Sequence, residues 1–184
     1  MEYNERGHRP VLSSYTIYKS LLFAFALFLF ACIQSSFFSV ISFFGVVPDL
    51  VLLAVIGIAV YDGERSGAVA GIFGGVLVEA FGAGGEIMML PLFYMLCGFF
   101  FGIAAHLIFN RNFISWLLYC LIGAAFRSAL SLVHAVLLES DVNILLIFTE
   151  IAIPEYFVTV LLSPLMYLPV RAVVRPFRKK AEME

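Results

Sequence analysis

Three of the charged residues of this chain, Asp49, Glu79 and Arg127, lie where a charge within an apolar stretch is costly and therefore informative. Asp49 begins one such stretch, Glu79 lies within a glycine-rich one, and Arg127 lies near the middle of a third. A cation at the centre of a membrane span costs at least about 2.5–3.5 kcal/mol on insertion scales, so it faces protein and pairs with another group. The chemistry that these residue types predict is an internal ion pair.

The spacing of the glycines indicates which face of its helix Glu79 occupies. Gly67, Gly71, Gly75 and Glu79 follow one another at intervals of four, so on a helix they form one ridge. In a bilayer, a ridge of small residues lets another backbone approach closely and pack by dispersion. We therefore expect the ridge, and Glu79 with it, to face protein. The alternative is a loose helix end near the interface, where a glutamate costs little.

Arg127 also lies on a small and polar helix face. Residues at helical spacing around it are Cys120, Gly123 and Ser131. We expect this face to turn inward. An ion pair made there could be purely structural.

The composition of the chain identifies its class. Of its 184 residues 62% are hydrophobic and 13% charged, and its mean hydropathy is +1.02. A soluble domain is about half apolar and a quarter charged. The chain is therefore predicted to be an integral membrane protein. Its formal net charge of −2, with no long basic run, gives no indication of nucleic-acid binding.

Motifs for catalysis, cofactors or metals are missing from the sequence. It contains no G-x-S-x-G, no H-E-x-x-H and no phosphate-binding P-loop pattern. Cys32, Cys97 and Cys120 lie in apolar segments without C-x-x-C or Cys/His spacing, so we expect free packed thiols. The sequence predicts no catalytic residue, no cofactor and no metal site, and hence a protein that is not an enzyme.

The apolar stretches divide into six predicted transmembrane helices. The fold class expected is all-α, with a six-helix transmembrane domain over residues 17–174, a polar N-terminal tail (1–16) and a charged C-terminal tail (175–184). Residues 38–47 are apolar and are expected to form an interfacial or partly re-entrant connection. Tight turns or loops are expected at 62–65, 82–86, 110–112 and 139–143. The six spans are predicted at Ile17–Phe37, Pro48–Tyr61, Ser66–Phe81, Ile87–Phe109, Phe113–Leu138 and Thr149–Val174.

The second of these spans is too short to cross a bilayer alone. Its residues cover roughly 21 Å at 1.5 Å each, whereas the hydrocarbon core is about 30 Å thick. Pro48 suits a first helical position, and Asp49 complements the helix dipole there. Either residues 46–47 extend the helix, or its N-terminus lies below the interface and is packed in protein. We favour the second interpretation.

The basic residues indicate an orientation. With six spans, one side of the membrane receives ten of the eleven Lys and Arg residues, and the eleventh is Arg127. The positive-inside rule then places both termini in the cytoplasm. The ten basic residues are Arg6, Arg9, Lys19, Arg65, Arg111, Arg171, Arg175, Arg178, Lys179 and Lys180.

The three intramembrane charges lie at one predicted depth. About 12 to 14 residues separate each from the basic end of its span, which corresponds to roughly 18–21 Å. Arg127 can hold a carboxylate and still donate to a second group. We expect it to bridge the second and fifth spans, the third and fifth, or all three. We favour Glu79 over Asp49 as its partner, because the glycine ridge faces protein.

Residues 48–102 resemble the rod shape-determining protein MreD family. The resemblance rests on Pro48-Asp49-Leu50 at the start of a short second span, on Tyr61–Arg65 at its end, and on the glycine-rich third helix from Gly71 to Glu79. A Gly/Pro-containing loop into an aromatic fourth helix completes the pattern. Many members of the family have Asp where this chain has Glu79, so a carboxylate is kept but its reach differs.

The resemblance implies a non-enzymatic scaffold of the bacterial cell-elongation machinery in the cytoplasmic (inner) membrane. Such a protein would contact membrane lipids and pair with MreC. It would couple the actin-like MreB filament to a RodA-type glycosyltransferase and its transpeptidase partner, and so control cell shape.

The MreD family is also similar in size and helix number to the S-components of energy-coupling-factor transporters, which bind substrates. This is the alternative function. Those proteins typically have an Ala-x-x-x-Ala surface on their first helix, and the first span here has Ala24, Ala26 and Ala31 but no such pair. Their ligand loops are also usually longer and more polar than residues 82–86 or 139–143.

Overall fold

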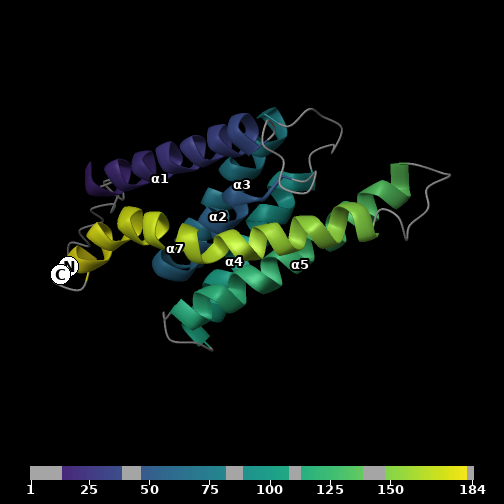
Figure 1. Ribbon diagram of the computed structural model, residues 1–184. Helices are drawn as coiled ribbons and strands as arrows, with labels where there is room; N and C mark the ends of the chain where they lie inside the picture. The colour runs from purple at the N-terminus through teal and green to yellow at the C-terminus, as the bar shows by residue number, and fades with distance from the viewer. Residues whose placement is uncertain (1–13, 39–46, 82–88, 108–112, 139–147, 182–184) are drawn as a thin grey trace, which may run out of the picture.

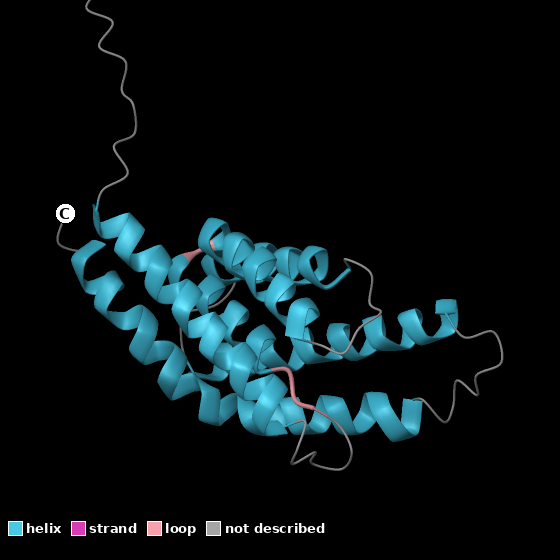
Figure 2. Ribbon diagram, turned by 90° about the horizontal axis from the view of Figure 1, so that it is seen from above, coloured by secondary structure: helices cyan, strands magenta, loops and turns pink. Residues whose placement is uncertain are grey.

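The protein is a bundle of helices. The computed structural model describes residues 14–38, 47–81, 89–107, 113–138 and 148–181 (Figure 1). Within these ranges every long element is helical, so the all-α prediction is confirmed. Figure 2 shows the same helices from above, with the described loops in pink. These loops are residues 47–49 and Gly63. The elements are α1 (Ser14–Ile33), η1 (Gln34–Phe38), α2 (Leu50–Asp62), α3 (Glu64–Phe81), α4 (Met89–Leu107), α5 (Phe113–Leu138), η2 (Phe148–Ala152) and α7 (Ile153–Ala181).

Each predicted span coincides with a helix, and the boundaries agree to within a few residues except at the C-terminal end. There α7 continues to Ala181, so most of the segment assigned to the tail is helical. Residues 1–13, 39–46, 82–88, 108–112, 139–147 and 182–184 lie outside the described residues. The loops predicted at 82–86, 110–112 and 139–143 and most of the 38–47 connection fall there, whereas the 62–65 turn is described.

Within the described residues, four helices are long and apolar enough to cross a membrane. These stretches are Ile17–Ser36, Met89–Leu107, Phe113–Val133 and Ile153–Val174. Helix α2 is apolar but has only 13 residues. Helix α3 is continuous, but it contains several glycines and charged residues. Membrane crossing by α2 and α3 stays a prediction.

Helix α2 occupies the centre of the bundle. Every residue from Leu50 to Tyr61 is buried, and α1, α3, α4, α5 and α7 all pack against it. Pro48 and Asp49, which precede it, are buried as well. The expectation that this N-terminus is packed in protein is therefore confirmed. A helix enclosed in this way need not match the bilayer thickness, because protein and not lipid surrounds its ends.

Charged side chains meet where α2 ends and α3 begins, beside the first turns of α1. Lys19 on α1 forms an ion pair with Asp62 at the end of α2. His106 Nε2 on α4 lies 3.9 Å from Glu64 Oε2 at the start of α3. Gly63 connects α2 to α3 there with a φ of 101°, a left-handed conformation that favours glycine. The structure thus brings Lys19 and the 62–65 turn together at one end of the bundle.

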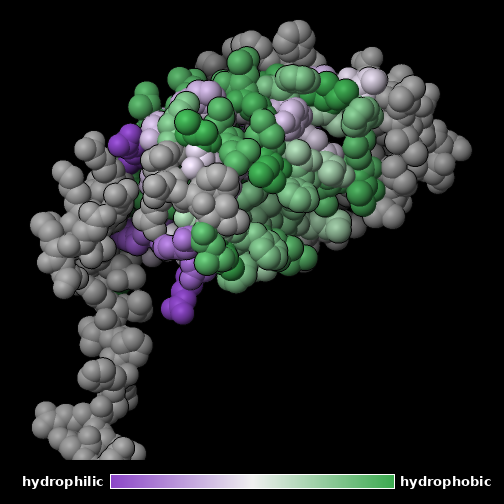
Figure 3. Space-filling model, turned by 90° about the horizontal axis from the view of Figure 1, so that it is seen from below, coloured by the Kyte–Doolittle hydropathy of each residue, from purple (hydrophilic) through white to green (hydrophobic). Residues whose placement is uncertain are grey.

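The outer surface of the body is apolar. Figure 3 shows hydrophobic side chains over most of the visible face, with the most hydrophilic ones near one end. Phe25, Phe100 and Leu161 are each at least 61% exposed, which would be unusual for so many large apolar side chains on a soluble protein. A surface of this kind is suited to lipid or to other membrane helices.

A proline inside α7 is accommodated by side chains. Pro164 has no backbone N–H, so the carbonyl of Val160 lacks its usual helical donor. The Ser163 hydroxyl donates to that carbonyl at 2.8 Å. The carbonyl of Ser163 in turn accepts a hydrogen bond from Trp116 Nε1 at 3.2 Å. Trp116 thus joins α5 to α7 next to this proline.

Candidate functional site

The first backbone amides of α2 are all satisfied, although they lie inside the protein. Asp49 caps the helix, because its Oδ1 accepts a hydrogen bond from Leu52 N at 2.9 Å. Val51 N donates to Gln34 Oε1 at 3.1 Å, a contact from the π-helical turn after α1. Leu50 N and Leu53 N donate to the carbonyls of Pro48 and Asp49 at 3.2 and 3.4 Å. A helix can therefore begin here without water.

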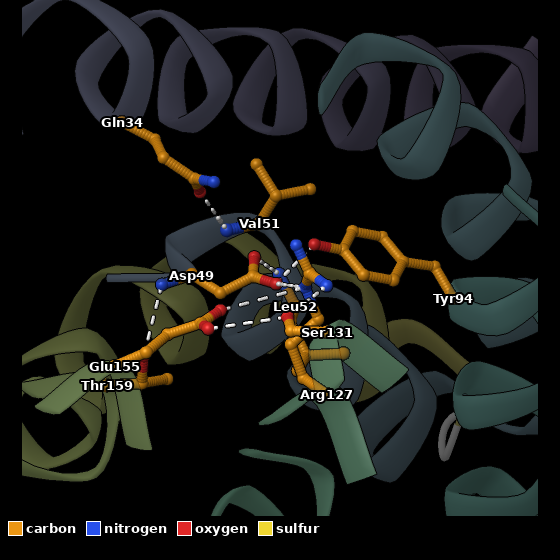
Figure 4. Close-up of polar contacts among 9 residues, drawn as sticks. All are labelled: Gln34, Asp49, Val51, Leu52, Tyr94, Arg127, Ser131, Glu155 and Thr159. Carbon is orange, nitrogen blue, oxygen red and sulfur yellow. Dashed lines mark hydrogen bonds and ion pairs between the residues drawn. The ribbon is translucent and has the colours of Figure 1, made fainter. Parts of the chain in front are cut away.

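Asp49 is also the centre of an ion cluster. Arg127 Nε on α5 lies 3.4 Å from Asp49 Oδ2 and 3.9 Å from Glu155 Oε1 on α7. The Tyr94 hydroxyl on α4 donates to Asp49 Oδ2. In Figure 4 the side chains of Tyr94 and Glu155 lie on opposite sides of the Asp49 carboxylate. We call Asp49, Tyr94, Arg127, Ser131 and Glu155 the polar cluster.

Neutral groups complete the polar cluster. Arg127 Nη1 donates to Ser131 Oγ at 2.9 Å, and the Ser131 hydroxyl lies 3.4 Å from Glu155 Oε2, to which it donates. Thr159 Oγ1 accepts a hydrogen bond from Asp49 N at 3.2 Å, so α7 also holds the backbone that leads into α2. The carboxylates of Asp49 and Glu155 share the guanidinium of Arg127. Hydroxyl and backbone N–H groups also donate hydrogen bonds to these carboxylates.

The polar cluster is well shielded. The side chains of Asp49, Arg127 and Glu155 are 4%, 13% and 13% exposed. A charge so placed is tolerated only when it is paired and hydrogen-bonded. Within the described residues, no group of three or more His, Cys, Asp and Glu side chains could hold a metal ion. The chemistry that this geometry supports is the fixed attachment of α2 to α4, α5 and α7.

The predicted inward face of α5 is confirmed. Cys120 is fully buried, and a Cβ added to Gly123 would lie 2.6 Å from Ile56 Cδ1 of α2. Ser131, one turn after Arg127, contacts the guanidinium as described above. Cys97 is buried and Cys32 half-buried, and both are free thiols, as is Cys120.

The glycine ridge packs against α4. Cβ atoms added at Gly67, Gly71 and Gly75 would lie 2.5 Å from Gly98 O, 2.2 Å from Tyr94 O and 2.4 Å from Pro91 Cα. These distances are shorter than any real contact, so the two backbones leave no room for a side chain. We call this α3–α4 contact the glycine seam. It confirms that the ridge faces protein and shows that its neighbour belongs to the same chain.

The preference for Glu79 as the partner of Arg127 was wrong. Helix α3 packs against α4, α2 and α1, whereas α5 packs mainly against α7 and α2. The ridge that carries Glu79 packs along α4, with Gly75 beside Pro91. Asp49 takes the expected place at Arg127, which bridges the start of α2 to α5.

Sequence reasoning missed Glu155, although a signal was present. Pro154-Glu155 at the start of an apolar helix repeats the pattern of Pro48-Asp49. Reading the two pairs together would have placed a second carboxylate at a helix N-terminus. Tyr94 and Thr159 carry no comparable signal, because single hydroxyl groups in apolar helices are common.

Comparison of the chain with protein-family models, with curated proteins and with solved structures finds no match.

Proposed function

We propose that this chain is a non-enzymatic scaffold of the MreD kind in the cytoplasmic membrane of a bacterium. In this role it binds MreC and links the RodA-type glycosyltransferase and its transpeptidase partner to the MreB filament, and so controls cell shape. The observation that supports the proposal is the polar cluster, in which charged groups deep in the bundle contact one another and a helix end. Contacts of this kind fix the helices relative to one another, which suits a rigid scaffold.

The engagement of Asp49 makes this argument specific. Its two carboxylate oxygens accept from Leu52 N and from the Tyr94 hydroxyl, and its backbone N–H donates to Thr159. A substrate entering at this point would have to displace contacts that begin the central helix. The apolar outer surface is left as the region for partners, which suits other membrane helices.

Affinity purification from the native membranes tests the proposal against its alternative. We expect MreC and the wall-synthesis enzymes to be recovered with the tagged chain. Recovery of an ATPase module instead would identify a transporter S-component and overturn the proposal. In a rod-shaped bacterium depleted of its own MreD, the chain should restore rods. The variant Gly71→Leu, which cannot form the glycine seam, should not.

The same proposal places both termini in the cytoplasm with six spans. Single cysteines near residues 5, 63, 111 and 180 should then be shielded in intact cells from a membrane-impermeant thiol reagent. Cysteines near 84 and 141 should react. Labelling of residue 63 from outside would contradict the six-span arrangement. Permeabilised cells, in which all six positions should react, provide the control.

A further inference from the structure

A groove runs along the outside of the bundle between α1 and α3. Its volume is about 620 Å³, within the range of roughly 300–1,000 Å³ that is usual for small-molecule sites. Phe23, Leu27 and Ala70, three of the residues that line it, are buried core residues. The groove is separate from the polar cluster, which involves neither α3 nor the first half of α1.

The groove is polar at one end and apolar at the other. Lys19, Ser20, Arg65 and Ser66 line the end where α1 and α3 both begin. Leu27 and Phe73 lie eight residues beyond Lys19 and Arg65, which is about 12 Å along a helix. One leaflet of a bilayer contributes about half of a 30 Å hydrocarbon core. The apolar part of the groove therefore has nearly the depth of one leaflet.

The polar end of the groove carries positive charge. Arg65 is exposed, and within the described chain no carboxylate forms an ion pair with it. Lys19 is largely covered, because it pairs with Asp62 and lies over the Phe23 ring at 5.8 Å from its centroid. The serine hydroxyls beside these cations can donate hydrogen bonds to an oxyanion. This combination suits a phosphate group.

We propose that the groove binds an anionic phospholipid of the leaflet at which α1 begins. The headgroup phosphate contacts Arg65 and Lys19, and an acyl chain lies between the α1 and α3 walls as far as Leu27 and Phe73. Basic pockets between membrane helices on the basic side of a protein bind acidic headgroups in this manner. The proposal does not depend on the function proposed above.

The charge of the rim argues against a partner helix in the same groove. Membrane proteins carry their excess of Lys and Arg on one common side, so a neighbouring span would bring more positive charge to Arg65. An anionic lipid brings the opposite charge. Charge complementarity therefore favours the lipid.

Native mass spectrometry of the purified protein tests the charge requirement. In micelles with equal amounts of phosphatidylglycerol and phosphatidylcholine, we expect retention of phosphatidylglycerol. Arg65→Gln should weaken that retention about fivefold, the factor expected for one basic residue near an anionic surface. Arg171→Gln is the control, because Arg171 is an exposed cation on α7 outside the groove. Equal retention of the two lipids, or equal effects of the two substitutions, would overturn the proposal.

A second pair of variants tests the apolar part. Val69→Trp fills the groove from a side chain that is 68% exposed, so the fold should tolerate it. Leu92→Trp on α4, at a site that is 55% exposed, is the matched control. Only the first should release phosphatidylglycerol, with both variants eluting as folded protein in gel filtration. A photo-crosslinker at residue 69 should label lipid in membranes, and labelling of a second polypeptide instead would overturn the proposal.

Discussion

The glycine seam and the polar cluster hold neighbouring helices together by two different kinds of contact. In the seam, α3 and α4 meet backbone to backbone, and a Cβ at Gly71 would lie 2.2 Å from Tyr94 O. In the cluster, long side chains from α5 and α7 reach the start of α2, with Arg127 3.4 Å from Asp49. The seam requires that its glycines have no side chain, whereas the cluster requires particular polar side chains. The two should therefore fail in different ways.

Tyr94 belongs to both regions. Its carbonyl lies against Gly71 in the seam, and its hydroxyl donates to Asp49 in the cluster. The close approach of α3 and α4 therefore helps to set where that hydroxyl sits. The close packing of the two backbones thus positions the Tyr94 hydroxyl, which donates to the buried Asp49 carboxylate. Four substitutions test the two regions separately and together.

The largest effect is expected for Arg127→Leu, which leaves Asp49 and Glu155 buried without their cation. We expect a loss of about 3–5 kcal/mol in the free energy of unfolding, the range for breaking a buried pair. The triple variant with Asp49→Asn and Glu155→Gln should recover part of this loss. Unfolding in mixed micelles by increasing SDS measures both. A neutral Arg127→Leu would mean that the cluster is not a structural tie, and Arg171→Leu controls for the loss of a cation alone.

The second effect concerns the seam. Gly71→Leu forces a side chain into the α4 backbone and should destabilise the protein by about 3 kcal/mol, the upper part of the overpacking range. Ile72→Leu is the control at the next position, which is 45% exposed. The same SDS unfolding assay applies to both. Equal stability of the two variants would contradict close packing at this point.

The third effect isolates one hydrogen bond of the cluster. Tyr94→Phe keeps the buried ring but removes the donor to Asp49, so we expect a loss of about 2 kcal/mol, as for hydrogen bonds to charged groups. Tyr119→Phe on α5 provides a control with a buried tyrosine outside the polar cluster. If Tyr94→Phe costs no more than the control, the hydroxyl does not contribute to the cluster.

The smallest effect tests whether the two regions are coupled through Tyr94. Gly71→Ala should push the α4 backbone away and loosen the bond to Asp49. In a double-mutant cycle with Tyr94→Phe, we expect a coupling of about 0.5–1 kcal/mol, since residues in contact are rarely additive. Gly67→Ala with Tyr94→Phe gives the comparison pair farther along the seam. Strict additivity at Gly71 would show that seam and cluster are independent.

Local features of the sequence were enough to locate the long helices and to identify several of their packed faces. Apolar length and charged turns located every helix of the described chain. The glycine spacing identified the face of α3 that packs, and the polar residues around Arg127 identified the inward face of α5. These features are local, because side-chain periodicity and the cost of a buried charge depend on the chain segment alone.

Which carboxylates contact Arg127 depends on how the helices pack in three dimensions. Depth placed Asp49 and Glu79 at one level, but depth says nothing about rotation around the bundle or about which helices are neighbours. Helix α3 lies against α4, whereas α7 lies against α5, so Glu155 contacts the guanidinium and the ridge of Glu79 runs elsewhere. The partners of Arg127 depend on which helices surround the buried helix α2. That arrangement results from the packing of all the helices together.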